Sequence, residues 1–366
     1  MPRIGVTGGS GFLGWHLRCA LHADDREIVD PAPREVFSDG RQLERFVATC
    51  DSIVHLAGVN RGDDVRLEHT NVDLTKQLVA ALAASRVRPQ VILASSIHQS
   101  SDTAYGRSKR VSAELLANWA AASGGTFTNL ILPHVFGECG RPFYNSVVAT
   151  FCHQLASGEA PRVLEDRELE LVHAQRVAGV ICDLIRHPAP GEHRVTGIPL
   201  SVSTLLARLQ EMAGRYANHV IPKLGTALDL ELFNTYRSFL FPGRYPMTPV
   251  QRTDDRGRLF EAVNSEREGG CFISTTPPGV TRGNHYHRAK IERFLVISGK
   301  ALIRVRKLFS TEIMEYRVCG DLPQYVDMPT LHTHNITNMG HENLITLFWS
   351  SEIFDPSRPD TFPEPV

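Results

Sequence analysis

The strongest constraint on the fold lies in residues 279–299, which read GVTRGNHYHRAKIERFLVISG. His285 and His287 stand two residues apart, a spacing that places both imidazoles on the same face of a β-strand. Glu292 follows His287 by five residues. Two imidazoles and a carboxylate suit a divalent metal and leave coordination positions open for water or substrate. The stretch therefore predicts β-strands that carry a metal site.

A further ligand is expected from a later strand. Residues 326–338, VDMPTLHTHNITN, offer His332 and His334 for this role. The alternative is a polar hairpin whose histidines face solvent. The full spacing, with a glycine at each end of residues 279–299, favours the metal site.

Residues 279–299 resemble the first motif of the cupin family, G(x)5HxH(x)4E(x)6G, at every specified position. The later segment resembles the second cupin motif, PxGxxHxxxN, at Pro329, His334 and Asn338, and Leu331 stands where the family has glycine. The resemblance implies a small antiparallel β-barrel with a divalent metal, zinc by expectation, inside it. By resemblance the metal ligands are His285, His287, Glu292 and His334. His332 is then a neighbour of the site.

Length and composition narrow the class of protein. A length of 366 residues predicts two domains. The formal net charge of −1 shows no excess of basic residues, which argues against binding to nucleic acid. No apolar run is long enough to span a bilayer, and the first strand begins too early for a signal peptide. The seven cysteines form no CxxC pair, which predicts reduced thiols and a cytoplasmic location.

The chain opens with an expected strand at residues 3–6, the glycine turn TGGSGFLG at 7–14, and a helical pattern through Leu17 and Leu21. Glycines in such a turn let backbone amides approach a pyrophosphate at the helix N-terminus. The alternative is a tight turn without a ligand. Its position directly after the first strand favours a dinucleotide site.

Further apolar runs at residues 27–30, 52–57 and 90–94 alternate with helical patterns, one of which is expected to open at Asn71. This alternation predicts a parallel sheet covered by helices on both faces. Asp30 ends the second expected strand, where an acid binds the adenosine ribose, whereas the nearby Arg34 suits a 2′-phosphate. The choice between NAD and NADP stays open.

Tyr105 and Lys109 lie four residues apart at the start of another expected helix and therefore share one face. A nearby ammonium stabilises tyrosinate and makes the phenol a usable proton donor. Ser96 stands at the carboxyl end of a strand, where catalytic groups of such sheets belong. The alternative for Tyr105 and Lys109 is a solvated helix face.

Four motifs resemble the extended short-chain dehydrogenase/reductase family: TGGSGFLG at 7–14, HLAG at 55–58, ASS at 94–96 and YGRSK at 105–109. The resemblance implies that Ser96 orients the substrate carbonyl, Tyr105 transfers the proton, and Lys109 lowers the pKa of the tyrosine and holds the nicotinamide ribose. It implies NADPH, with NADH as the alternative, bound by Gly8, Gly11, Phe12, Leu13, Gly14, Asp30, Arg34, Leu56, Ala57, Gly58 and Lys109. Ile97-His98 follows Ser96 where sugar-nucleotide dehydratases of the family carry Asp-Glu, which argues against dehydration.

The expected fold class is α/β: an N-terminal Rossmann-type parallel sheet and a C-terminal all-β cupin barrel. Residues 242–249, PGRYPMTP, break the periodicity and mark a linker. We predict a reductase domain with a small substrate lobe at 1–241, a linker at 242–250 and a cupin domain at 251–366. The lobe is expected from helical patterns at 147–155, 177–185 and 203–216. Arg141, in the loop beyond residues 130–137, either pairs with a diphosphate or is solvated.

The whole chain resembles the bifunctional capsular-polysaccharide enzymes of the CapF type. Shared stretches include HLAGVNR at 55–61, YNSVVATFC at 144–152, DDRG at 254–257, GNHYH at 283–287 and FDPSRPDT at 354–361. The resemblance implies a UDP-2-acetamido-2,6-dideoxy-4-keto-hexose as substrate. It further implies C3 epimerisation in the cupin domain, C4 reduction with NADPH in the reductase domain, and a 6-deoxy-L-talosamine-type product. A homodimer joined through the cupin domains is also implied, with no membrane partner.

Three alternatives remain open at this stage. The first is a single-function reductase whose cupin domain, with its metal, is structural. The second is a dinucleotide-sensing binding module, against which the presence of Ser96, Tyr105 and Lys109 argues. The third is an iron-dependent cupin oxygenase, which uses similar ligands. The sequence does not identify the base for C3.

Overall fold

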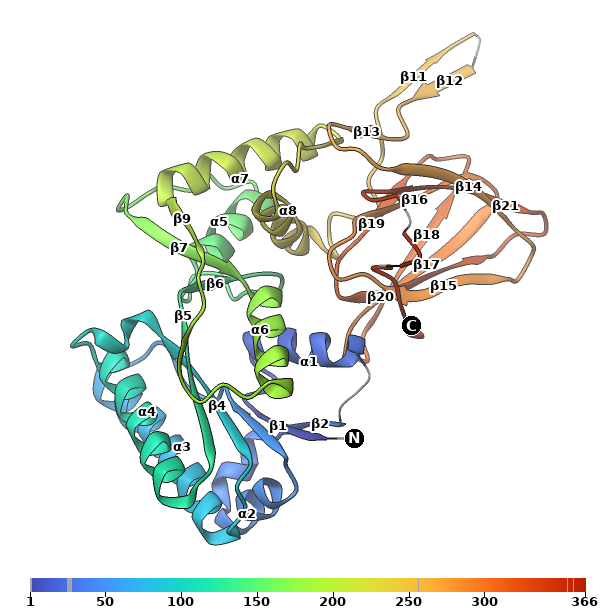
Figure 1. Ribbon diagram of the computed structural model, residues 1–366. Coiled ribbons are helices and arrows are strands. Elements are labelled where there is room, and N and C mark those ends of the chain that lie inside the picture. Colours follow the sequence, from blue (N-terminus) through green and yellow to red (C-terminus); the bar gives the residue numbers. More distant parts are fainter. Residues whose placement is uncertain (1, 25–27, 256, 354, 358) are drawn as a thin grey trace. The chain divides into compact units, whose positions relative to one another are not determined.

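The computed structural model describes residues 2–24, 28–255, 257–353, 355–357 and 359–366 (Figure 1). The chain divides into two compact units. The first consists of Met1–Phe136, Gly140–Val147 and Glu165–Val202, and the second of Gly137–Cys139, Val148–Leu164 and Ser203–Val366. This division differs from the limits expected from the sequence in placing residues 203–241 with the C-terminal strands. The reductase and cupin limits stay a prediction.

Six parallel strands form the central sheet of the first unit, in the order β2-β1-β3-β4-β5-β8. Their bounds are β1 Arg3–Thr7, β2 Ile28–Ala32, β3 Ser52–His55, β4 Gln90–Ser96, β5 Thr126–Leu132 and β8 Gly191–Arg194. Since β2 and β3 lie on opposite sides of β1, the strand order reverses there. The carboxyl ends of strands at such a reversal form the usual ligand crevice of doubly wound folds.

Helices cover both faces of this sheet (Figure 1). They are α1 Phe12–Asp24, α2 Gly40–Ala48, α3 Asp64–Ser85, α4 Ala104–Ser123 and α6 Ala174–Arg186, with short 3-10 helices η1 Arg34–Ser38 and η2 Ile97–Ser100. One core cluster joins Leu17 of α1 and Ile181 of α6 to Ile92 of β4. The other joins Leu78 of α3 to Val91 of the same strand. Neighbouring residues of β4 therefore point to opposite helix layers, as a sheet buried on both faces requires.

A smaller three-stranded sheet completes the first unit. Its strands, in the order β6-β7-β9, are β6 His134–Phe136, β7 Glu168–His173 and β9 Ile198–Ser201. The helix expected at 177–185 is α6, which follows β7 directly and packs with α1 in the core cluster against the large sheet. It therefore belongs to the sheet's cover and not to a separate lobe.

The second strand and the long helix of this unit have different limits from those expected from the sequence. The second strand does not end at Asp30, because its pairing with β1 continues to Ala32; Glu27, the expected first residue, lies outside the described residues. The long helix does not open at Asn71. It begins at Asp64, because the side chain of Asp63 caps it by accepting a hydrogen bond from the backbone N–H of Arg66 at 3.0 Å.

Two antiparallel sheets form the C-terminal part of the second unit, in the orders β14-β21-β16-β19 and β18-β17-β20-β15-β22 (Figure 1). Their bounds are β14 Gly270–Thr276, β15 Thr281–Tyr286, β16 Glu292–Ser298, β17 Lys300–Lys307, β18 Ile313–Cys319, β19 Tyr325–Met328, β20 His332–Asn338, β21 Leu344–Ser350 and β22 Phe362–Pro363. The Phe294 ring of β16 lies 4.5 Å from Phe348 of β21 and 5.6 Å from His334 of β20, centroid to centroid. The two sheets therefore face each other across a shared interior. The expected fold class, parallel α/β followed by all-β, is confirmed.

Short two-stranded pairs flank these sheets. They are β10 Val220–Ile221 with β13 Asn264–Ser265, and β11 Gln251–Asp254 with β12 Gly257–Phe260. Three residues in the stretches quoted from the sequence, Arg256, Phe354 and Arg358, lie outside the described residues.

The helices of the second unit are α5 Val147–Ala156, α7 Val202–Ala217 and α8 Ala227–Leu240. Helix α8 was not expected from the sequence. The available signal was a capping box, in which Thr226 accepts from the N–H of Asp229 at 3.1 Å and Asp229 accepts from the N–H of Thr226 at 3.1 Å.

Buried polar contacts tie α7 and α8 to the four-stranded sheet. Asp327 of β19 receives two bonds from the guanidinium of Arg293 of β16, at 2.7 and 2.9 Å. The Tyr216 hydroxyl of α7 donates to the same carboxylate at 2.5 Å, and Arg237 of α8 donates to the carbonyl of Met328 at 2.7 Å. These contacts explain why the two helices group with the sheets.

None of the seven cysteines, all of which the structure describes, takes part in a disulfide. Among the described residues, no helix has both the length and the apolar character needed to span a membrane.

Candidate functional sites

The glycine turn between β1 and α1 lies where the strand order of the first unit reverses. Gly8 has φ 72°, and a Cβ on it would lie 2.7 Å from the backbone nitrogen of Ala57. A Cβ on Gly14 would lie 2.2 Å from the carbonyl oxygen of Gly8. Only glycines allow the turn to pass this close to the end of β3 and lead directly into α1. Backbone N–H groups at the N-terminus of α1 make the turn suited to a pyrophosphate.

A pocket of about 520 Å³ lies beside this turn. Its walls include most of the expected cofactor contacts, namely Gly8, Gly11, Phe12, Leu13, Gly14, Leu56, Gly58 and Lys109. Three expected contacts, Ala57, Asp30 and Arg34, are not among the described wall residues. Asp30 instead forms an ion pair with Arg3 at 3.2 Å, and Arg34 opens η1 with an exposed side chain.

The same pocket brings together Ser96, Tyr105 and Lys109. Helix η2 carries the chain from the end of β4 back to α4. Thr103 caps α4 by accepting from the N–H of Gly106 at 3.1 Å, and a Cβ on Gly106 would lie 2.3 Å from the carbonyl oxygen of His98. Glycine at this position therefore lets η2 pack against the first turn of the helix that holds the tyrosine and the lysine.

Burial controls the protonation of the two helical residues. It lowers the pKa of Lys109 to about 8. It raises the pKa of Tyr105 to about 12, against a smaller opposing effect of a hydrogen bond with Ser96. The Lys109 ammonium lies 5.6 Å from the centre of the Tyr105 ring and donates to the carbonyl of Ala94 at 2.8 Å. The expected lowering of the tyrosine pKa by Lys109 is therefore not found, and the phenol is protonated at neutral pH, the form that donates a proton.

A network of buried polar side chains connects the elements that carry the site. The sequence analysis did not predict this network. Nδ1 of His55 lies 2.7 Å from the hydroxyl of Thr7, and Nε2 lies 3.3 Å from the hydroxyl of Thr75. Thr75 donates to Ser112 of α4 at 2.9 Å. Burial lowers the pKa of His55 to about 3, so the imidazole is neutral. The network connects the strand before the glycine turn to the helix that carries Tyr105.

The remaining wall of the pocket is cationic and aromatic. The Arg141 guanidinium lies 4.9 Å from the centre of the Tyr144 ring, and the Tyr144 hydroxyl accepts from the N–H of Asn60 at 3.4 Å. The rings of His98 and His134 meet edge to face at 5.7 Å. Among the described wall residues there is no carboxylate. This wall suits an anionic ligand such as a diphosphate, and here Arg141 would meet it.

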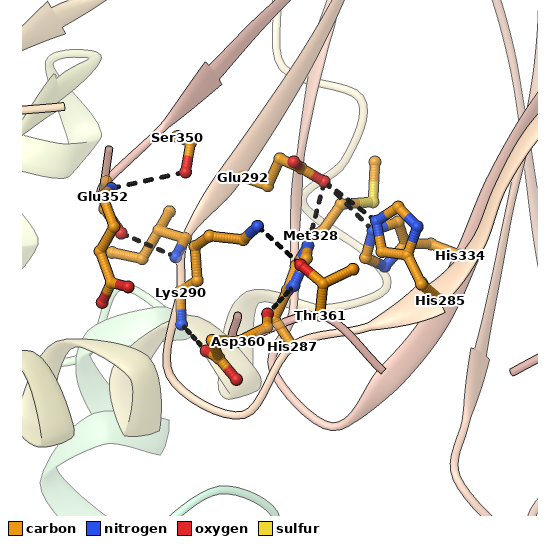
Figure 2. A network of polar contacts seen from close by, with 12 residues as sticks. His285, His287, Lys290, Glu292, Met328, His334, Ser350, Glu352, Asp360 and Thr361 are labelled. Carbon is orange, nitrogen blue, oxygen red and sulfur yellow. Dashed lines mark hydrogen bonds and ion pairs between the residues drawn. The ribbon is translucent and has the colours of Figure 1, made fainter. Parts of the chain in front are cut away.

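In the second unit, the four expected metal ligands converge (Figure 2). Their ligand atoms all lie within 4.8 Å of one another. His285 of β15 pairs with His334 of β20, His287 follows β15, and Glu292 opens β16. One Glu292 oxygen lies 3.1 Å from Nε2 of His287, 3.3 Å from Nε2 of His334 and 3.6 Å from Nε2 of His285.

The orientation of the imidazoles fits a cation. Nδ1 of His287 lies 2.5 Å from the carbonyl oxygen of Asp360, and Nδ1 of His334 lies 3.1 Å from that of His332. A carbonyl only accepts, so each Nδ1 carries the proton and each Nε2 turns a lone pair toward Glu292. Burial lowers the pKa of His334 to about 4, which keeps this ring neutral.

His285 and Glu292 support the same conclusion. Nε2 of His285 is buried and has no hydrogen-bond partner among the described residues. Lone pairs and a carboxylate directed at one another repel unless a cation lies among them. Three nitrogens and one oxygen, with backbone carbonyls orienting two of the rings, are a donor set for zinc.

The C-terminal segment holds the loop between β15 and β16 in place, a role that sequence reasoning missed. The Asp360 carboxylate accepts hydrogen bonds from the backbone N–H groups of Arg288, Ala289 and Lys290 at 2.7 to 2.8 Å. Asp360 stands 73 residues after His287. No local pattern in the sequence joins these two segments.

The turn before His334 forms with leucine in place of glycine. Leu331 has φ 60°, and its N–H donates to the carbonyl oxygen of His287 at 2.7 Å. Its side chain is fully buried. His332 is outside the ligand group. Its Nδ1 lies 2.7 Å from the carbonyl oxygen of Thr330.

A pocket of about 660 Å³ opens onto the ligand group. Its described titratable wall residues are His285, Lys290, Glu292, Glu352, Asp355 and Asp360. The pocket of the second unit is therefore acidic, in contrast to the pocket of the first.

Comparisons with known proteins agree with this architecture. Residues 4–197 match the NAD dependent epimerase/dehydratase family, and residues 252–362 match the polysaccharide biosynthesis C-terminal domain. The chain is 31% identical over 365 residues to a UDP-2-acetamido-2,6-beta-L-arabino-hexul-4-ose reductase of Pseudomonas aeruginosa, covering 98% of each chain.

Solved structures show the same likeness. The capsular polysaccharide assembling protein CapF of Staphylococcus aureus is 32% identical, with full coverage of both chains and a TM-score of 0.64. RMD of Pseudomonas aeruginosa, solved in complex with NADPH, is 22% identical over 58% of this chain and 84% of its own, with a TM-score of 0.54. The second likeness bears on the fold alone.

Proposed function

Because this chain belongs to the NAD dependent epimerase/dehydratase family, and to its CapF-type members, it is an NAD(P)-dependent sugar-nucleotide enzyme; we propose that it catalyses two successive steps. The substrate is a UDP-2-acetamido-2,6-dideoxy-4-keto-hexose. The C-terminal β region inverts C3, and the N-terminal unit then reduces the C4 ketone with NADPH. The product is a UDP-6-deoxy-L-talosamine-type precursor of a surface polysaccharide.

The observation that carries the proposal is the full-length likeness to a reductase of a UDP-linked 4-ketosugar in a chain that also holds the His/Glu group. Likeness confined to residues 4–197 would support reduction alone. The ligand group beside the acidic pocket supports a second activity in the same chain.

The residues of the first unit suit ketone reduction. NADPH, when bound beside the glycine turn, would supply the hydride that C4 needs. Tyr105, protonated at neutral pH, gives its proton to the carbonyl oxygen, and Ser96 orients that oxygen. The proton leaves the phenol as the oxygen gains negative charge. Lys109 lies in the same wall and would hold the nicotinamide ribose, and Arg141 would hold the diphosphate of the nucleotide.

The residues of the second unit suit enolisation. A hydrogen α to a ketone is acidic enough to be removed when the negative charge that develops on the oxygen is stabilised. A divalent metal, when bound, supplies such stabilisation, and we assign its binding to His285, His287, Glu292 and His334. The Asp360 carboxylate accepts 2.7 to 2.8 Å bonds from the N–H groups of the β15–β16 loop, which keep that loop, and with it His287, in position.

We further propose a homodimer joined through the C-terminal β regions. Strand β14 is at the edge of its sheet and leaves Phe272 49% and Ile273 66% exposed. An exposed apolar edge strand favours pairing with a second chain. Analytical ultracentrifugation of the full chain and of an Ile273→Lys variant tests this: the variant is expected to be monomeric.

The two-step proposal is tested by proton NMR in deuterated water with the UDP-linked ketosugar. The C3 proton signal is expected to disappear before NADPH is added, and a new 6-deoxysugar to appear afterwards. Reduction without prior exchange would instead indicate a single-function reductase with a structural C-terminal region. The absence of any reaction would reject the substrate.

A further inference from the structure

Four carboxylates stand in the wall of the acidic pocket, and three of them are already engaged. Glu292 lies among the three imidazoles. Asp360 accepts three backbone N–H bonds, and Asp355 accepts from the backbone and the hydroxyl of Ser357 at 2.9 and 2.7 Å. The Glu352 carboxylate has no hydrogen bond or ion pair within the described residues, and Figure 2 draws no contact from it. It is therefore the one of these four groups that is free to take up a proton.

Glu352 stands beside the ligand group because of the strand register. Ser350, the last residue of β21, pairs with Glu292, the first residue of β16. The pairing extends one step further, since the N–H of Ser351 donates to the carbonyl of Ile291 at 2.9 Å. Glu352 follows Ser350 by two residues, and its half-buried side chain reaches the same pocket wall as Glu292.

The surroundings of Glu352 suit proton abstraction from a sugar. Lys290 reaches the same pocket and donates to the hydroxyl of Thr361 at 3.1 Å, which places a positive charge close to the ligand group (Figure 2). A pocket of about 660 Å³ holds a ligand of the size of a hexose with part of its nucleotide. The carboxylate and the ligand group share one cavity, so a single sugar ring can meet both.

We propose that Glu352 is the general base that removes the C3 proton of the ketosugar; this inference rests on the proposed epimerase activity. One oxygen of Glu352 takes the proton, the C–H electron pair forms the C3–C4 double bond, and the carbonyl π pair moves to the C4 oxygen. A water molecule then protonates C3 from the opposite face, and the carbonyl re-forms. The hydroxide that is left takes the proton from Glu352, which restores the carboxylate.

The test uses the full-length protein in deuterated water without NADPH. Glu352→Gln is expected to slow the loss of the C3 proton signal by about 10²- to 10⁴-fold, the usual contribution of a general base. Its metal content and its NADPH-dependent reduction of the C3-epimerised ketone are expected to equal those of the unsubstituted protein. Glu352→Ala is expected to regain exchange when formate is added, a response that a structural role would not produce.

Glu342→Gln is the matched control, since Glu342 is an exposed carboxylate of the same β region outside the pocket wall. It is expected to exchange at the unsubstituted rate. If the unsubstituted protein exchanges C3 and Glu352→Gln does so within tenfold, the role of Glu352 is refuted and the epimerase survives. If the unsubstituted protein exchanges no proton, the proposed epimerase fails and the inference falls with it.

Discussion

Replacing Asp327 by asparagine should strongly destabilise the second unit. The Asp327 carboxylate is fully buried and receives bonds from Arg293 and from Tyr216. Burial would raise its pKa, but Arg293 outweighs burial and holds the pKa below its usual value, so the pair is ionised. Asp327→Asn leaves the Arg293 charge buried without a counter-charge. Breaking a buried pair in this way costs about 3–5 kcal/mol.

A matched control exists in the neighbouring sheet. Arg304 and Glu315 also form an ion pair across adjacent strands, at 2.8 Å, but their side chains are 40% and 44% exposed. Solvent screens this pair, so Glu315→Gln should cost about 0–1 kcal/mol. The two substitutions remove the same kind of charge and differ in burial.

Hydrogen exchange followed by mass spectrometry of peptides from β16 and β19 measures the effect locally. A loss of about 3–5 kcal/mol should speed exchange of the most protected amides by about 10²- to 10⁴-fold, at about 1.4 kcal/mol per factor of ten. Glu315→Gln should change these rates less than about tenfold. Equal effects of the two substitutions, or a loss below about 1 kcal/mol for Asp327→Asn, would refute the argument that burial makes this pair essential.

Four further predictions follow from the two sites. Tyr105→Phe should reduce NADPH oxidation by about 10²- to 10⁴-fold while C3 exchange, followed by NMR, continues; full turnover would contradict the assignment. The folded pKa of His55 is about 3, against about 6.5 when unfolded, so the unfolded chain binds the extra proton and stability falls as pH drops from 6.5 toward 3. Urea titrations at pH 7 and pH 5 should therefore differ by about 2 kcal/mol more for the unsubstituted chain than for His55→Gln, and equal differences would reject this role. Leu331→Gly should lower stability by about 1–4 kcal/mol in urea titration, because the loss of a buried leucine exceeds the relief of left-handed strain; a gain in stability would show the opposite balance. His285→Ala combined with His287→Ala should lose bound metal by mass spectrometric analysis, and an unchanged content would exclude this ligand set.

The sequence predicted the metal-ligand group because its spacing is local. His285, His287 and Glu292 fall within eight residues, and one β-strand and one turn are enough to bring them together. His334 was found through the second motif, although Leu331 replaced the expected glycine. A left-handed backbone at a buried leucine cannot be read from the sequence, because tertiary packing offsets its strain.

The features that the sequence did not predict depend on contacts between residues that are far apart in the chain. The support of the β15–β16 loop by Asp360 depends on a partner 70 to 72 residues away. The neutral state of His55 depends on burial between two helices and a strand. Asp30 was expected to contact the cofactor from the end of a strand, but the strand is two residues longer and the side chain pairs with Arg3. Periodicity indicates elements, whereas boundaries and partners depend on packing that only the folded chain provides.

The late position of Asp360 also sets an order of events during synthesis. Every strand of the two facing sheets except β22 precedes Asp360 in the chain and is therefore synthesised before it. Until then the β15–β16 loop lacks the carboxylate that binds three of its amides. A chain that ends before Asp360 therefore contains the paired strands and still lacks the contacts that hold His287 in place. A transcript that stops short of Asp360 should yield a paired β region that captures its metal poorly.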